Sequence, residues 1–294
     1  MFKASIFTVS GTVGALLCAQ CLVATAAHGQ QLPAVSGPNG KVEFSAGVFN
    51  LPATPNFHAR AAGSFSFPVT DAFGVQGDLA FFNSPSGLGV ASAVHGFTRD
   101  PSSYLLGVTG AFVRVPGATL IGVGPEGELY LGQWTLEAWA GVANLNYDDP
   151  LLADKAGVFG FGDVAYYPTE DLRLSVGASH VLGYNQLRLG AEYQVTHFDM
   201  PFSVTGEGRI GQDGTVIATL GLKFYLGGEA KSLIDRHRQD DPPDREVDFF
   251  GGAGNLPYEK APVVVPVVQT EEELCEADGL HNWQGVGECI LNVG

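Results

Sequence analysis

The feature that most constrains this chain is a series of segments, between about Lys41 and Leu226, in which apolar and polar residues alternate with a period of two. In the segment 171–179 the even-numbered positions are apolar and the odd-numbered positions are polar or glycine, and the segment 186–195 repeats the pattern. Successive side chains on a β-strand point to opposite faces. The pattern therefore predicts strands with one apolar face and one polar face.

The predicted strands are long for a globular protein. Each is roughly nine to thirteen residues, whereas globular strands average about five or six and a tilted membrane strand needs about ten. Short and long connections largely alternate, as they do when short turns face the periplasm and long loops face outside. We expect about twelve strands, at 41–49, 59–69, 72–82, 88–97, 104–115, 119–131, 134–145, 158–167, 172–184, 186–196, 202–211 and 215–226.

The N-terminus indicates export. Residues 1–26 have the character of a secretory signal peptide, with Lys3 as the charge, an apolar core over 6–23 and small residues at 24–26 for cleavage. No later segment offers about 18 uninterrupted apolar residues, so a helical membrane protein is excluded. We therefore expect an all-β, antiparallel up-and-down transmembrane barrel over 41–227, preceded by a lead at 27–40. A soluble exported β-sandwich or barrel is the alternative.

Each alternating strand assigns its residues to a lipid face or a lumen face. The apolar set, which we expect to face lipid, comprises Phe65, Phe67, Val69, Phe73, Val75, Leu79, Phe81, Leu172, Leu174, Leu187, Leu189, Val216, Leu220, Leu222 and Phe224. The charged set, which we expect to line the lumen, comprises Glu43, Arg60, Asp78, Glu126, Glu128, Glu137, Arg173, Arg188, Glu192, Glu207 and Arg209. A membrane barrel, unlike a soluble one, has its apolar face outside.

The chain changes character after the last predicted strand. Residues 228–294 are expected to form a periplasmic extension, with a short helix at 229–238 and a glycine-rich turn at 249–254. They contain too few apolar residues to bury a core of their own. Cys275 and Cys289 are predicted to form a disulfide, because an isolated cysteine pair in an oxidising compartment is typically oxidised. A zinc site is disfavoured, because neither cysteine has a short-range Cys or His partner.

Three segments carry a family resemblance. They are Leu32–Lys41 at the start of the mature chain, Pro201–Arg209 with Gly221–Tyr225 at the closing hairpin, and Leu233–Pro243 beyond it. In these segments the chain resembles the porin-like outer-membrane barrel proteins of α-proteobacteria, which implies location more than activity. Two features depart from the family pattern: the chain continues well past Phe224 and Tyr225, and its cysteine loop has no counterpart there.

The pattern leaves three functions open. The first is a porin-like channel for small solutes, cation-preferring because the chain has 31 Asp and Glu against 15 Lys and Arg. The second is a non-conducting structural barrel in which arginines pair the carboxylates and the tail contacts periplasmic partners or the cell wall. The third is a lipid-modifying barrel enzyme. His95 and His180 lie within predicted strands, but the sequence has no serine in the spacing of a nucleophile elbow. We expect no enzyme, cofactor or metal site. A net charge of −16 argues against nucleic acid and leaves membrane lipid and small solutes as partners.

Overall fold

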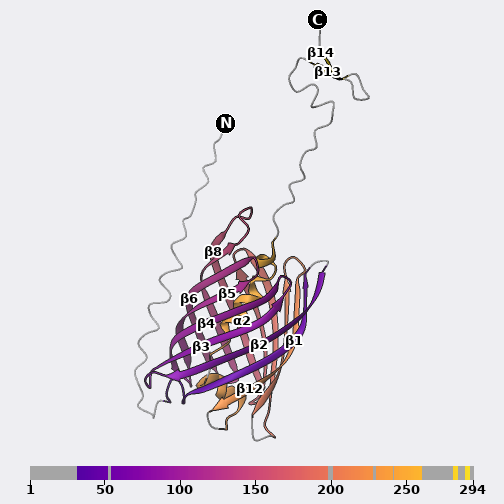
Figure 1. The fold of residues 1–294 in the computed structure, drawn as a ribbon. Helices are drawn as coiled ribbons and strands as arrows, with labels where there is room; N and C mark the ends of the chain where they lie inside the picture. The colour runs from indigo at the N-terminus through magenta and orange to yellow at the C-terminus, as the bar shows by residue number, and fades with distance from the viewer. Residues whose placement is uncertain are drawn as a thin grey trace, which may run out of the picture.

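The computed structural model describes residues 32–51, 54–197, 201–227, 230–240 and 242–259, and the backbone of 281–283 and 289–291. Within these residues twelve strands form a closed antiparallel barrel (Figure 1), which confirms the predicted fold class. The strands are β1 (Asn39–Leu51), β2 (Thr54–Pro68), β3 (Phe73–Ser84), β4 (Gly87–Asp100), β5 (Tyr104–Val115), β6 (Ala118–Leu131), β7 (Trp134–Tyr147), β8 (Lys155–Thr169), β9 (Leu172–Val181), β10 (Tyr184–Val195), β11 (Phe202–Gly211) and β12 (Val216–Gly227).

The barrel has two distinct rims because every strand pairs antiparallel with its sequence neighbours. β1 closes the barrel on β12, in a register that runs from Asn39 opposite Gly227 to Asn50 opposite Val216. We call the end that carries Asn39 and Gly227 the termini rim; its connections include 69–72, 101–103, 132–133 and 170–171. We call the other end the loop rim; its connections include 85–86, 116–117, 148–154, 182–183 and 212–215.

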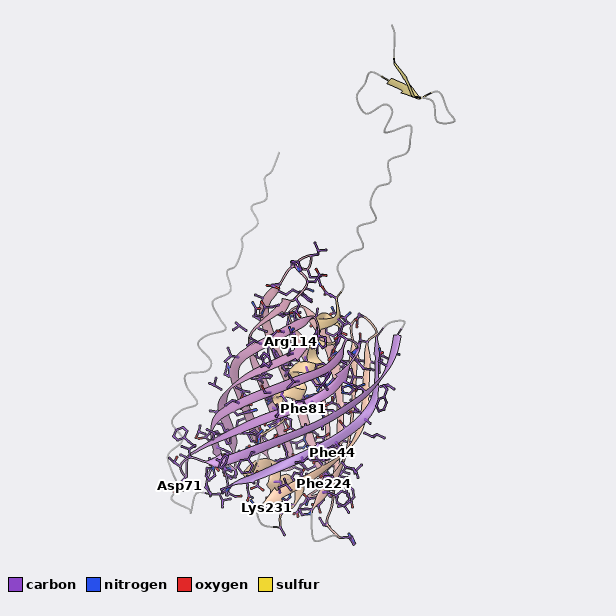
Figure 2. The ribbon with its side chains drawn as sticks, in the orientation of Figure 1. Phe44, Asp71, Phe81, Arg114, Phe224 and Lys231 are labelled. Atoms are coloured by element: carbon purple, nitrogen blue, oxygen red, sulfur yellow. The ribbon has the colours of Figure 1, made fainter. Side chains whose placement is uncertain are left out.

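The outer surface of the barrel is apolar. Phe65 is 45% exposed, Leu189 60% and Leu220 73%, although each is a large hydrophobic side chain. Figure 2 shows such side chains projecting from the wall, Phe44 and Phe81 among them. The strands thus expose their apolar residues and enclose their charged ones. Because a soluble barrel has the opposite arrangement, this is the surface of a barrel that spans a bilayer.

Three short helical elements follow β12. They are α1 (Leu233–Gln239), α2 (Arg245–Ala253) and the 3-10 helix η1 (Leu256–Tyr258). Among the described residues, no helix is long and apolar enough to cross a membrane. The short strands β13 (His281–Trp283) and β14 (Cys289–Leu291) pair antiparallel with each other. The signal peptide and Cys275 lie outside the described residues, so the cleavage site and the disulfide stay predictions.

The segment after β12 enters the barrel, which differs from the expected periplasmic extension. α1 lies at the termini rim, where the backbone amide of Ile234 donates to the carbonyl of Glu170 (3.0 Å). At the loop rim the hydroxyl of Tyr147 donates to the carbonyl of Leu256 (2.8 Å). α2 lies between them, inside the ring of strands (Figure 1). We call residues 233–259 the plug.

The barrel supplies the core that the plug lacks. Phe249, Ala253 and Leu233 are buried, although the segment alone has too few apolar residues to bury them. The turn predicted at 249–254 is wrong, because α2 runs through to Ala253. Its glycines permit close approach: a Cβ on Gly252 would lie 2.6 Å from the ring of Phe161. The plug is therefore shaped to the inner wall.

Candidate functional site

The lumen is the candidate functional site, and it has two chemically different halves. From the termini rim to the middle of the barrel its wall is mostly charged, and the predicted lumen-lining residues lie inside the barrel, Arg188 and Arg209 nearer the loop-rim ends of β10 and β11. Glu43, Asp78, Glu126, Glu128, Glu137, Glu192 and Arg209 are buried, and Arg60, Arg173, Arg188 and Glu207 are half-buried. Toward the loop rim the wall is apolar and aromatic. Charge alone therefore describes only half of the lumen.

The charged half is largely neutralised by ion pairs within the barrel wall. Among the described strand residues there, eight carboxylates face seven Lys and Arg side chains: Glu43, Asp78, Glu126, Glu128, Glu137, Asp163, Glu192 and Glu207 against Lys41, Arg60, Arg99, Arg173, Arg188, Arg209 and Lys223. The N–O distances of the pairs are 2.7 Å for Arg60–Glu43, 2.7 Å for Arg173–Glu137, 2.5 Å for Arg209–Glu207 and 3.0 Å for Lys223–Glu192. Paired charges of this kind neutralise one another rather than attract ions.

The plug adds its own charges to this network. The carboxylate of Asp248 contacts three guanidinium groups, those of Arg188, Arg209 (3.2 Å) and Arg245 (3.0 Å). Arg245 in turn lies 3.3 Å from a carboxylate oxygen of Glu126 on β6. The plug is therefore fixed to the wall by charge-assisted contacts on several sides.

A buried histidine joins two wall carboxylates. His95 Nε2 lies 2.7 Å from Asp78, and Nδ1 lies 2.9 Å from Glu126 and 3.0 Å from the hydroxyl of Thr109. Thr109, His95 and Asp78 thus have the order of a nucleophile, a base and an acid. The hydroxyl of Thr109, however, donates to Glu126 at 2.6 Å, and both Thr109 and His95 are fully buried. A substrate has no access to this group, so its role is structural.

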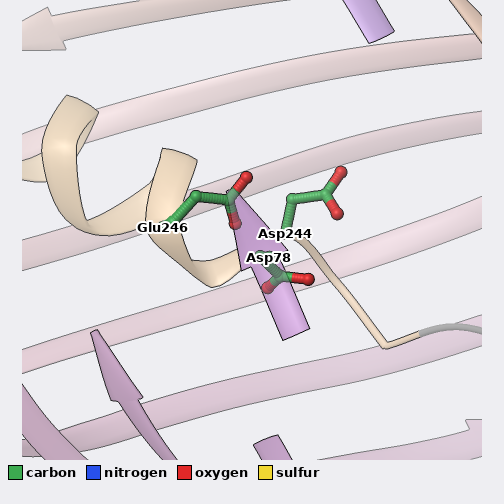
Figure 3. A group of neighbouring side chains, drawn as sticks. All are labelled: Asp78, Asp244 and Glu246. Atoms are coloured by element: carbon green, nitrogen blue, oxygen red, sulfur yellow. The ribbon is translucent and has the colours of Figure 1, made fainter. Parts of the chain in front are cut away.

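Three carboxylates meet where α2 begins. Oxygens of Asp78, Asp244 and Glu246 lie within 4.8 Å of one another (Figure 3). Asp78 is already held by His95, and Asp244 by the ammonium group of Lys41 at 2.7 Å. The carboxylate oxygens of Glu246 are buried and have no hydrogen-bond partner among the described residues. Because an isolated carboxylate ion is costly to bury, Glu246 fits this position as the neutral acid.

A polar cavity of about 140 Å³ remains in the charged half, beside the plug. Its walls come from β6–β12, β1 and β2 and from the plug. They include Glu128, Arg173, Glu192, Lys223 and Asp244. The cavity is polar and large enough to hold ordered water. The charged half is thus partly filled rather than packed solid.

Aromatic packing closes the apolar half. The ring centroid of Phe250 lies 3.9 Å from that of Phe82, and Phe249 lies 5.2 Å from Phe159 and 5.5 Å from Trp139. Phe249 also sits directly over Gly122, where a Cβ would lie 2.4 Å from its ring. We call these contacts the aromatic seal. Phe249, at the centre of these contacts, is fully buried.

Sequence reasoning missed the residues of the aromatic seal. Trp139, Phe159 and Phe161 occupy lumen-facing positions of their strands, where the prediction considered charged residues only. The sequence did contain a usable signal. Bulky apolar residues at lumen-facing positions would contact water unless another apolar group enters the lumen and covers them. The adjacent pair Phe249 and Phe250 is that group.

The loop rim carries further fixed contacts. Hydrogen bonds from the Arg114 guanidinium lower the pKa of Asp148, in the loop between β7 and β8. Glu259, at the end of the plug, pairs with Lys155 at the start of β8. His180, which lies near this rim, bonds through Nδ1 to the side chain of Asn185 (2.8 Å). These are ordinary polar contacts of an exposed rim.

Comparison with known proteins yields only structural likeness. No family model and no curated protein matches the chain. Its barrel is similar to the KdgM porin in complex with disordered oligogalacturonate, at 8% identity and a TM-score of 0.44, over 64% of this chain and 99% of that one. It is also similar to the outer membrane phospholipase A of Escherichia coli, at 13% identity and a TM-score of 0.41, over 65% of this chain and 92% of that one. A third is the translocator domain of the autotransporter NalP from Neisseria meningitidis, at 8% identity and a TM-score of 0.39, over 65% and 88%. Likeness at this level carries no argument about activity, and the resemblance to the α-proteobacterial proteins stays a prediction.

Proposed function

We propose that this protein is an outer-membrane barrel that its own chain holds closed, and that it is non-conducting in this state. The single observation that carries the proposal is the aromatic seal, in which Phe249 and Phe250 fill the apolar half of the lumen. The paired charges of the other half support it, because they leave few free carboxylates to attract ions. The apolar outer surface and the predicted signal peptide support the location.

Planar bilayers test this function. The full-length protein is expected to be silent at moderate voltage, whereas a variant with Phe249→Ala and Phe250→Ala is expected to show stepwise openings. The matched control is Phe65→Ala with Phe67→Ala, a second aromatic pair with ring centroids 4.2 Å apart that faces lipid. This control is expected to stay silent. Frequent openings of the unaltered, folded protein would overturn the proposal.

A channel for small solutes is the second candidate, and the polar cavity beside the plug favours it. In that case the plug is a gate that moves to let solutes through. The wall that it would uncover has eight carboxylates against seven bases, so the cation preference would be weak. The reversal potential of the Phe249→Ala, Phe250→Ala variant in a salt gradient measures that preference. We propose no catalytic role, because Thr109 with His95, the nucleophile-like group found among the described residues, is fully buried.

A further inference from the structure

The two ends of the plug lie at opposite rims of the barrel. β12 ends at Gly227, which pairs with Asn39 at the termini rim. There the backbone amide of Ser36 donates to the carbonyl of Gln239 at the end of α1 (2.9 Å). Figure 2 places Lys231, just before α1, at the same end as Asp71, and Arg114 toward the other end. The chain therefore enters the lumen from the termini rim.

The chain reaches the loop rim at the end of η1. The ring of Tyr258 lies 5.6 Å from that of Phe49, near the end of β1, and Glu259 pairs with Lys155 beside the loop 148–154. The side chain of Glu259 is 37% exposed, so the plug ends at solvent. The aromatic seal, in which Phe249 and Phe250 pack against the wall, lies in the lumen behind it.

We infer that the chain crosses the barrel once more through its lumen, so that residues 260–294 begin on the face that carries the loop 148–154. This replaces the predicted periplasmic position of the C-terminal residues. With the termini rim toward the periplasm, those residues belong to the outer face of the cell. Residues 260–294 contain six Asp and Glu against one Lys, so the stretch delivered there is acidic. The barrel then serves as the anchor of a displayed segment, and a partner that recognises that segment by charge is basic.

Protein tags at three positions test the inference. One epitope tag follows Gly294, a second is inserted in the loop 148–154 at the loop rim, and a third in the turn 132–133 at the termini rim, each in a separate full-length protein. Intact cells are stained with antibody, and cells with a permeabilised outer membrane serve as the reference. The tag after Gly294 is expected to stain like the tag in 148–154. Staining that follows the tag in 132–133 instead would overturn the inference, whichever way the barrel faces.

A deletion distinguishes passage through the lumen from passage around the barrel. Removing residues 231–257 attaches the tagged C-terminal residues almost directly to β12 at the termini rim. In this variant the terminal tag is expected to change sides, while the tags in 148–154 and 132–133 keep theirs and so report that the barrel has folded. A terminal tag that stays on the loop side would mean that the plug does not carry the chain across. The inference rests on the plug that the proposed function also invokes. If the unaltered protein conducts ions while its tag after Gly294 stains like the tag in 148–154, only the proposed closed state is overturned.

Discussion

Replacing Phe249 with alanine is expected to loosen the plug without disturbing the strands. Phe249 is fully buried against Trp139, Phe159 and Gly122, and truncating a buried Phe to Ala costs about 3–5 kcal/mol. None of these contacts joins one strand to another, so the loss falls on the docking of the plug. Since about 1.4 kcal/mol is a factor of ten, the released fraction should rise by roughly two to three and a half orders of magnitude.

Thiol labelling measures that released fraction. In a background without Cys275 and Cys289, Ala253→Cys places a thiol at a position that is fully buried in α2. A water-soluble maleimide can react with it only when the plug leaves the lumen, so the labelling rate follows the released fraction. Phe249→Ala should raise that rate by the factor given above, and Phe81→Ala, which faces lipid, should leave it unchanged. Equal rates in the two variants would refute the aromatic seal as the lock on the plug.

Three substitutions test the two faces of the wall and the buried acid, each by urea unfolding in lipid bilayers. Leu189→Arg should cost about 2–4 kcal/mol, because Leu189 faces lipid; tolerance of the change would mean that this face is not in the membrane. Its neighbour Arg188 contacts both Asp163 and Asp248, so Arg188→Ala should cost about 3–5 kcal/mol by leaving two buried carboxylates without this partner. Glu246→Gln should cost less than about 1 kcal/mol at neutral pH, because the neutral amide replaces a neutral acid of the same shape; a loss as large as that at Arg188 would mean that Glu246 is ionised.

The two partners of Arg188 show where sequence reasoning stops. The alternation that placed Arg188 and Leu189 on opposite faces is a local property of the chain, so it was available without the structure. That Arg188 has a partner on β8 and another on α2 depends on the register around the barrel and on the path of the plug. Neither is local, so the sequence places Arg188 in the lumen but does not identify the residues that it contacts there.

The plug escaped prediction for a related reason. A continuous apolar stripe predicts an amphipathic helix, but the nine residues of α2 contain two aromatics, two glycines and three charged residues. Its complement is divided among many strands, with Phe82 on β3, Trp139 on β7 and Phe161 on β8. Each of these looks like an ordinary strand residue in its own segment. Only the closed barrel places them around one point.

The position of Asp244 has a kinetic consequence. Its carboxylate lies 2.7 Å from Lys41 on β1, 3.0 Å from the hydroxyl of Ser64 on β2 and 4.0 Å from Lys223 on β12, so it joins the three strands around the line where the barrel closes on itself. The contacts of this segment join residues that are far apart in the sequence; Lys41 and the carbonyl of Pro242, for example, are 201 residues apart. Contacts of such long range form late in folding. Interactions absent from the transition state act mainly on the unfolding rate. Asp244 is therefore expected to lower the unfolding rate of the closed barrel and to have little effect on its folding rate.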